Sequence, residues 1–244
     1  MKRFLAVQHT FSEFFGALEP QFEARDIGFT YVRTVAGQDV AGTPSQFDAL
    51  WLLGGAHPAS DREHCPFIEQ EINLVRAFER ARRPVIGLGF GAHVLAAAHG
   101  AALYAEPEHD ARFALARALV ADDPLARAVD GRSVLVMANG RAELAPGSVP
   151  LVTDETGGWL AFRAGEWSYG LLFRPELKPG MLEDMVMEED RPVPDNIGEL
   201  IEAAREQWPA LQEITNRVSA ALVAALGLMD ERRKAPVFPI LERR

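Results

Sequence analysis

The chain has 244 residues, of which 48% are hydrophobic, and its formal net charge is −10 at pH 7. This acidic balance argues against nucleic-acid or anionic-membrane partners, which need clustered Lys and Arg, and no stretch approaches the ~18 apolar residues of a membrane span. With one cysteine there is neither a disulfide framework nor a cysteine-based metal site, so we expect a cytoplasmic protein without a metal or cofactor.

The first part of the chain carries strand, helix and turn patterns. The expected elements are a strand at 3–8, a helix at 11–25, a strand at 30–33, a Gly/Pro/Ser loop at 37–45 and a strand at 48–53. The last strand ends in Gly54 and Gly55, where the absence of a side chain lets the backbone approach a ligand closely. An ordinary strand-to-loop turn is the alternative interpretation of this glycine pair.

A polar loop at 57–66 follows, and it caps a helix expected at 67–82 whose apolar residues have helical spacing. The loop contains His64 and Cys65, which together suggest a displaced Cys–His dyad. Adjacent residues in a polar loop seldom face each other productively, and nothing in the sequence supplies a third group to orient the histidine. We therefore interpret this loop as surface structure.

The stretch 84–96 is the most informative, because it is typical of a buried strand that turns sharply into a helix. Val85 and Ile86 form a short apolar run after Pro84, and three alternating glycines precede an alanine-rich helical pattern. In such an elbow the central residue lies on a strained turn at the carboxyl end of a parallel sheet, beside a helix N-terminus. Enzymes place a nucleophile there, whereas this chain places Gly89.

Further strands and helices are expected beyond the elbow. They are a helical continuation at 94–99, strands within 102–120, a helix start at 122–124, a strand at 133–138, a turn at 139–140 and a hairpin of strands at 159–163 and 167–173. Residues 187–196 are rich in acid and proline, which is typical of a linker. An apolar stripe over 197–226 predicts two helices divided at Pro209.

Three motifs, in this order, resemble the class I glutamine amidotransferases, namely the amidotransferase domain of GMP synthetase and its free-standing relatives. The motifs are Leu52-Leu53-Gly54-Gly55-Ala56, Gly87-Leu88-Gly89-Phe90-Gly91-Ala92-His93 and Gly170-Leu171-Leu172-Phe173-Arg174-Pro175-Glu176. The family has a Gly-Gly oxyanion turn, an elbow of the form G-x-C-x-G-x-Q and a later strand that ends in His-Pro-Glu. The resemblance spans roughly residues 1–190. It implies a three-layer, flavodoxin-like α/β sandwich with a mostly parallel sheet, extended here by C-terminal helices.

The resemblance also implies that the catalytic machinery is missing. By motif position, the family's nucleophilic Cys is Gly89, its following Gln is His93, its His is Arg174, and only Glu176 is retained. A guanidinium stays protonated at any working pH, so Arg174 cannot act as a general base. All six histidines lie at or before His109, so the half of the chain that supplies the family's base has no imidazole.

Without a thiol at the elbow, its backbone amides, the helix N-terminus and Arg174 would converge on one spot of positive potential. We expect a small anionic ligand there, in a pocket lined by Gly55, Phe90, Gly91, His93 and Arg174. Two alternatives remain open. His93 could satisfy local backbone groups, and an ion pair between Arg174 and Glu176 could close the pocket.

We divide the chain into an amidotransferase-like domain at 1–190, a helical extension at 191–231 and a mobile tail at 232–244. The resemblance and the apolar C-terminal stripe suggest a homodimer or a partner enzyme subunit. Two functions remain open. One is a non-catalytic, regulatory homologue that binds a ligand or a partner, and the other is an amide-hydrolysing enzyme of the same superfamily that uses an unrecognised nucleophile.

Overall fold

The computed structural model describes residues 2–40, 42–189 and 191–228. Its strands are β1 Lys2–Gln8, β2 Ile27–Arg33, β3 Ala49–Leu52, β4 Val85–Leu88, β5 Ala102–Tyr104, β6 Asp110–Leu115, β7 Arg117–Ala118, β8 Ser133–Ala138, β9 Arg141–Glu143, β10 Ser148–Thr153, β11 Trp159–Ala164 and β12 Ser168–Leu171. Its α-helices are α1 Glu19–Glu23, α2 Ile68–Arg80, α3 Phe90–Ala98, α4 Pro124–Val129, α5 Pro179–Met187, α6 Ile197–Glu206 and α7 Trp208–Ala225.

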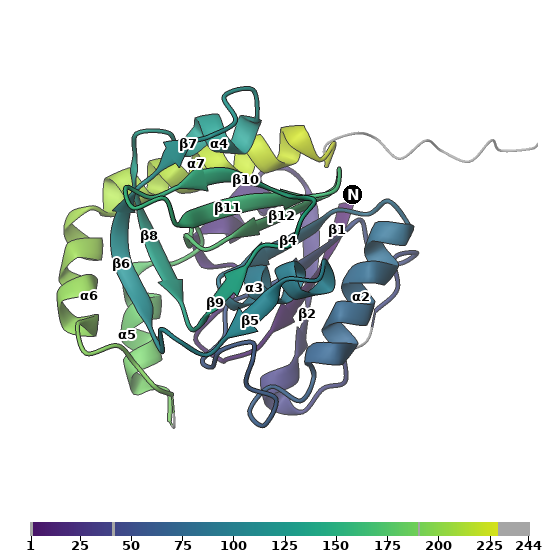
Figure 1. The fold of residues 1–244 in the computed structure, drawn as a ribbon, viewed down its shortest axis with the longest axis horizontal. Helices are drawn as coiled ribbons and strands as arrows, with labels where there is room; N and C mark the ends of the chain where they lie inside the picture. Colours follow the sequence, from purple (N-terminus) through teal and green to yellow (C-terminus); the bar gives the residue numbers. More distant parts are fainter. Residues whose placement is uncertain (1, 41, 190, 229–244) are drawn as a thin grey trace, which may run out of the picture.

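An eight-stranded sheet with the order β2-β1-β3-β4-β12-β11-β10-β7 forms the centre of the fold (Figure 1). The strands from β2 to β12 in this order are parallel, and β11, β10 and β7 continue the sheet in antiparallel pairing. Two small antiparallel sheets, β5–β9 and β6–β8, lie beside it. The predicted α/β sandwich with a mostly parallel sheet and C-terminal helices is confirmed.

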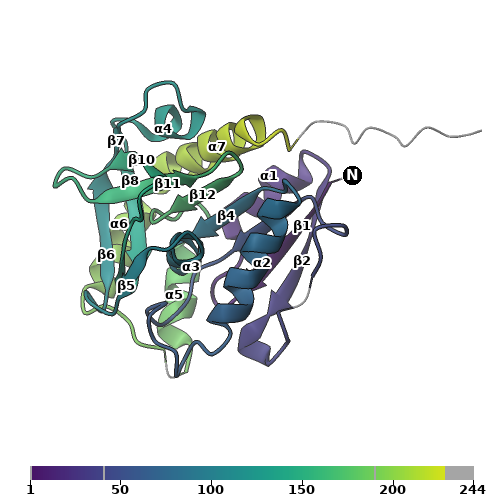
Figure 2. The same ribbon diagram turned by 45° about the vertical axis from the view of Figure 1, so that its right-hand side comes forward.

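Side chains that alternate along the central strands divide the apolar core into two layers, because successive residues of a strand point to opposite faces. Leu5 and Leu52 pack in one layer with α2 and α3, whereas Phe4 and Trp51 pack in the other with α4 to α7. Figure 2 shows α2 and α3 well apart from α7. Because β1, β3, β4 and β12 are parallel neighbours, their carboxyl ends lie side by side between two layers of helices. We call this end of the sheet the sheet edge.

The helix predicted at 11–25 is wrong in its first half. Residues 9–15 form a loop, and a short 3-10 turn at Gly16–Leu18 precedes α1. Gly16 has φ +50°, and a Cβ at this position would overlap the carbonyl oxygen of Glu176. The amide of Ala17 donates to that same oxygen at 2.9 Å. Contact with the segment after β12 thus keeps these residues out of a helix and places the loop over the sheet edge.

The segment after β12 also differs from the prediction, because α5 was not foreseen and Met187 belongs to it. The remainder of the predicted linker has no regular structure in its described residues, yet Glu188 and Arg191 turn back toward the sheet edge. The division of the C-terminal helices near Pro209 is confirmed, since α6 ends at Glu206 and α7 begins at Trp208.

Both C-terminal helices contribute to the same apolar layer as the central strands. The Thr215 hydroxyl of α7 donates to the carbonyl oxygen of Pro175 at 2.6 Å, which ties this helix to the segment after β12. The domain boundary at residue 190 stays a prediction, and the tail predicted at 232–244 lies outside the described residues. Within the described chain, no helix is both long and apolar enough to cross a bilayer.

Candidate functional site

The predicted strand–elbow–helix is present, with Gly89 at the bend between β4 and α3. Its backbone has φ +53° and ψ −111°, a conformation that glycine adopts more readily than any other residue. The elbow lies tight against β3, because a Cβ at Gly91 would overlap the Leu52 carbonyl. The Gly91 amide donates to the carbonyl oxygen of Leu53 at 3.1 Å, so this amide already has an acceptor within the fold.

Arg174 occupies the space beside the elbow. A Cβ built on Gly89 would lie 2.9 Å from Nη1 of Arg174 and 2.9 Å from the carbonyl oxygen of Met137. Nη1 of Arg174 also donates to that carbonyl oxygen at 3.1 Å. The fold therefore brings the substituted motif positions together, and a guanidinium fills the volume next to the elbow where a thiol would project.

Two buried carboxylates neutralise Arg174. Its Nε lies 2.6 Å from Oε1 of Glu176, which is one of the alternatives that the sequence left open, and its Nη1 lies 2.9 Å from Oε1 of Glu13. The three side chains are at most 2% exposed. Gly54 packs directly against this ion pair, because a Cβ on Gly54 would overlap both Arg174 and Glu13. The glycine turn after β3 thus makes room for an ion pair.

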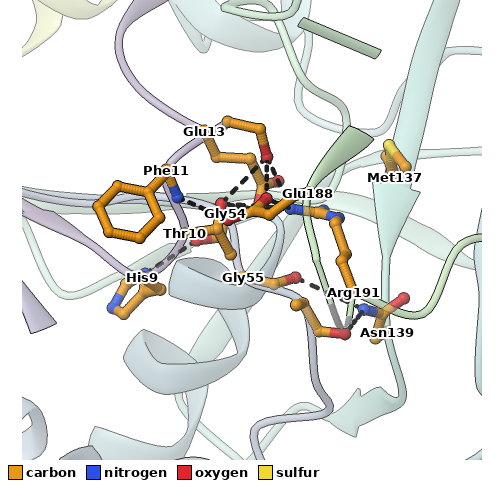
Figure 3. A network of polar contacts seen from close by, with 12 residues as sticks. His9, Thr10, Phe11, Glu13, Gly54, Gly55, Met137, Asn139, Glu188 and Arg191 are labelled. Carbon is orange, nitrogen blue, oxygen red and sulfur yellow. Dashed lines mark hydrogen bonds and ion pairs between the residues drawn. The ribbon is translucent and has the colours of Figure 1, made fainter. Parts of the chain in front are cut away.

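A second guanidinium, that of Arg191, completes this buried cluster (Figure 3). Its Nη1 lies 3.2 Å from Oε2 of Glu13 and 3.2 Å from Oε2 of Glu188. Burial would raise the pKa of Glu13, but Arg191 and Arg174 together lower it to about 2. Burial raises the pKa of Glu176 despite the opposing effect of Arg174. With three carboxyl groups around two guanidiniums, the cluster has no net positive charge to offer an anion.

The residues predicted to line an anion pocket are only partly brought together. Gly55 and Phe90 line one cavity, Arg174 and Gly55 line a second and much smaller one, and His93 lines neither. His93 is 1% exposed, and its ring packs 6.0 Å from that of Trp159. Burial lowers the pKa of His93 to about 4. This side chain is therefore a neutral imidazole in the core beneath the elbow.

The larger cavity has a volume of about 350 Å³ and lies over the glycine turn after β3. Its lining residues are His9, Thr10, Thr34, Val35, Gly55, Ala56, His57, His64, Cys65, Phe67, Phe90, Glu188, Glu189 and Arg191. It combines aromatic walls with polar groups, as small-molecule sites do. The site thus extends away from the elbow toward the loop at 57–66.

His9, which lines this cavity, belongs to a buried His9–Glu71 pair that the sequence did not reveal. Nδ1 of His9 lies 2.9 Å from the carbonyl oxygen of Gly54, and Nε2 lies 2.8 Å from Oε1 of Glu71. Both neighbours are acceptors, so the ring must be doubly protonated to donate to both. Burial opposes this charge, but the Glu71 carboxylate and the Gly54 carbonyl raise the pKa of His9 above its ordinary value of 6.5 overall.

We expect the stability contributed by His9 to fall as the pH rises. A group whose pKa is raised on folding contributes its full stability below its unfolded pKa and loses that stability as the pH rises through its folded pKa. Urea unfolding of the wild type and of a His9→Gln, Glu71→Gln variant should therefore give free energies whose difference shrinks between pH 6 and alkaline pH. A difference that grows with pH would contradict a charged His9.

Asn139 has a role beyond the turn that the sequence predicted. Its Nδ2 donates to the carbonyl oxygen of Ala56 at 2.6 Å, and its Oδ1 lies 2.9 Å from Nδ1 of His109. Gly140 supplies the predicted turn with φ +70°. The end of β8 thereby holds the glycine turn after β3 from the side opposite His9.

The sequence carried a signal for one of the missed residues. Glu71 lies three residues after Ile68 and four before Val75, so it falls on the apolar stripe of α2 and had to be buried with a partner. Glu13 and Arg191 gave no comparable signal, because the first lies in a segment with helical spacing and the second in a polar, proline-rich segment.

Comparisons with known proteins agree with the resemblance to glutamine amidotransferases. No protein-family model matches the sequence. A curated relative, the putative glutamine amidotransferase-like protein YfeJ of Salmonella typhimurium, is 33% identical over 107 residues. The match covers 43% of this chain and 45% of the relative, so it spans less than half of that protein.

Solved structures match over almost the whole fold. A glutamine amidotransferase from Thermotoga maritima has a TM-score of 0.76 at 20% identity, over 92% of this chain and 98% of its own. A glutamine amido transferase from Methylobacillus flagellatus has a TM-score of 0.78 at 18% identity, over 92% of this chain and 95% of its own. A putative GMP synthase protein from Thermoplasma acidophilum has a TM-score of 0.61 at 13% identity, over 95% of this chain and 98% of its own. At these identities the likeness establishes the fold.

Proposed function

We propose that this chain, which resembles the glutamine amidotransferases in fold and motif order, is a non-catalytic homologue that binds a small ligand or a partner protein. A cytoplasmic location is part of the same proposal. The single observation that carries it is the buried Arg174 beside Gly89, held by Glu13 and Glu176.

Acyl transfer by a cysteine nucleophile needs a thiolate and a base that can take up and return a proton. Gly89 has no side chain, and Arg174 stays protonated at any working pH. The guanidinium also fills the space next to the elbow, so a substrate carbonyl has neither a nucleophile nor room beside it. The fold retains the elbow while its chemistry is lost.

The alternative, an enzyme with an unrecognised nucleophile, has little support at the cysteine. Cys65 is 4% exposed, and burial raises the pKa of its thiol to about 12, whereas reactive cysteines are partly exposed thiolates. Its neighbour His64 directs Nδ1 to Asp61 at 2.7 Å. These contacts argue against a displaced Cys–His dyad.

The cavity over Gly55 and Phe90 is the place we propose for the ligand. Thr10, Thr34 and His57 line it, and hydroxyl and imidazole groups can donate hydrogen bonds to a small anionic ligand. Beside this cavity, Phe11 and Met187 are strongly exposed and border a second hollow of about 540 Å³. Such apolar side chains support, as a further proposal, a partner protein or a second copy of the chain at this edge.

We expect purified wild-type protein to release no ammonia from glutamine above the rate of a Cys65→Ala control, because neither protein has a working nucleophile. Gly89→Cys should also remain inactive, since a Cβ at Gly89 would lie 2.9 Å from Arg174 Nη1 and no base is present. The measurement is glutamate or ammonia release over time. Turnover by the wild type that Cys65→Ala abolishes would overturn the proposal.

A further inference from the structure

The loop after the glycine turn contains a compact group of metal-binding side chains. One ligand atom from each of His57, Asp61 and His64 lies within 4.8 Å of the other two. The two imidazole rings are stacked with their centroids 4.2 Å apart and an interplanar angle of 14°. The loop thus gathers two nitrogen ligands and one oxygen ligand from eight consecutive residues of the sequence.

Backbone hydrogen bonds shape the loop around Asp61. The Asp61 amide donates to the carbonyl oxygen of Pro58 at 2.9 Å, and the Cys65 amide donates to the carbonyl oxygen of Asp61 at 3.0 Å. Oδ1 of Asp61 accepts from the amides of Glu63 and His64 at 3.0 and 3.2 Å. These bonds leave Oδ2 directed at Nδ1 of His64, 2.7 Å away.

We propose that His57, Asp61 and His64 form a site for a divalent transition-metal ion of the zinc class. Imidazole nitrogen and carboxylate oxygen bind Zn²⁺ at about 2.0–2.2 Å, and such bonds place neighbouring ligand atoms about 3.3 Å apart. The metal would replace the proton between Asp61 and His64, so the 2.7 Å contact between them would open, and the longer separations of up to 4.8 Å between ligand atoms would shorten. One of the two stacked rings would also turn, so that both nitrogen lone pairs face the ion. His64 is 54% exposed on its side chain, so its ring is free to adjust.

The ligand set also argues for the class of metal. Two imidazoles favour zinc and its neighbours over Mg²⁺ and Ca²⁺, which prefer oxygen ligands. Cys65 is buried and does not belong to the group of three side chains whose ligand atoms lie close together. Three protein ligands leave one coordination position open.

The open coordination position lies next to the cavity over the glycine turn. His57 and His64 both line the 350 Å³ cavity over the glycine turn, so a small anionic group in that cavity could reach the metal. The nearby Arg191 pairs with Glu13 and Glu188, which reduces its repulsion of a cation. The metal site therefore stands independently of whether the protein has any catalytic activity.

The test is metal binding by the full-length protein, freed of any histidine tag. Zn²⁺ is titrated in competition with a chromophoric chelator, and Co²⁺ is added separately to record its visible absorption bands. We expect one Zn²⁺ per chain, and we expect His57→Gln, Asp61→Asn and His64→Gln each to weaken binding at least about tenfold. Circular dichroism checks that each variant keeps its fold, as changes on an exposed loop should allow.

Two further variants serve as controls. His99→Gln removes a partly exposed histidine that pairs with Glu79 on α2, and Cys65→Ala removes the thiol; both should bind Zn²⁺ like the wild type. The proposal is overturned if the wild type takes up no stoichiometric Zn²⁺. It is also overturned if the three loop variants bind within about twofold of the wild type, or if Cys65→Ala abolishes binding.

Discussion

Glu13→Ala is expected to lower the free energy of unfolding by about 3–5 kcal/mol, because it leaves two buried guanidiniums short of a carboxylate. Glu13 contacts Arg174 at 2.9 Å through Oε1 and Arg191 at 3.2 Å through Oε2. All three side chains are at most 4% exposed, so bulk water does not reach the two guanidiniums to solvate them in place of the carboxylate. Urea unfolding followed by circular dichroism would measure the loss.

A matched control is Glu183→Ala, which removes a carboxylate 2.9 Å from the exposed Arg205. Exposed ion pairs contribute between about 0 and 1 kcal/mol, so this variant should unfold almost like the wild type. If Glu13→Ala and Glu183→Ala lower the free energy of unfolding by similar amounts, the buried cluster does not stabilise the fold, and our account of Arg174 is wrong.

Gly91→Ala is expected to destabilise the protein by about 1–3 kcal/mol or more, because overpacking against rigid groups forces the backbone apart. The new methyl group would overlap the Leu52 carbonyl, which is backbone of β3. The first turn of α3 would have to move away from the sheet, together with the elbow residue Gly89. Thermal unfolding of both proteins would measure the effect.

Gly198→Ala is the control for this change. Gly198 lies in the first turn of α6, and a Cβ there meets no atom within 4 Å among the described residues. Alanine favours a helix over glycine by up to about 1 kcal/mol, so this variant should be as stable as the wild type or slightly more stable. A neutral Gly91→Ala would mean that α3 does not pack against β3 as tightly as described.

The two predictions test separate aspects of the same site. The elbow is held by contacts between backbone atoms, whereas the space beside it is filled by charged side chains from distant segments. The first feature matches the glutamine amidotransferase fold, and the second is the basis of our proposal that the chain is non-catalytic. A loss of stability in both Glu13→Ala and Gly91→Ala would show that the elbow and the charged cluster beside it both stabilise the fold.

Most of the fold could be predicted because its signals are local. The apolar strand after Pro84 and the glycines around Gly89 indicate a strand, a bend and a helix within a short stretch, and the structure has all three. The stripe over 197–226 likewise predicted α6 and α7, since an apolar helical period can be identified without knowing which surface it will cover. The first half of the helix expected at 11–25 was wrong because a distant contact outweighed its local pattern, whereas α1 lies in the second half.

The sequence by itself determined that the elbow position has no nucleophile and that Arg174 cannot supply a base, because these are properties of residue types at spaced motif positions. Only the tertiary structure decided what Arg174 does. Its partner Glu13 lies on a loop that the contact of Gly16 with Glu176 keeps out of a helix, and Arg191 returns from beyond α5. A buried charge is stable only beside an opposite charge or a hydrogen-bond partner. Which residue becomes that partner depends on long-range packing, which no local sequence pattern encodes.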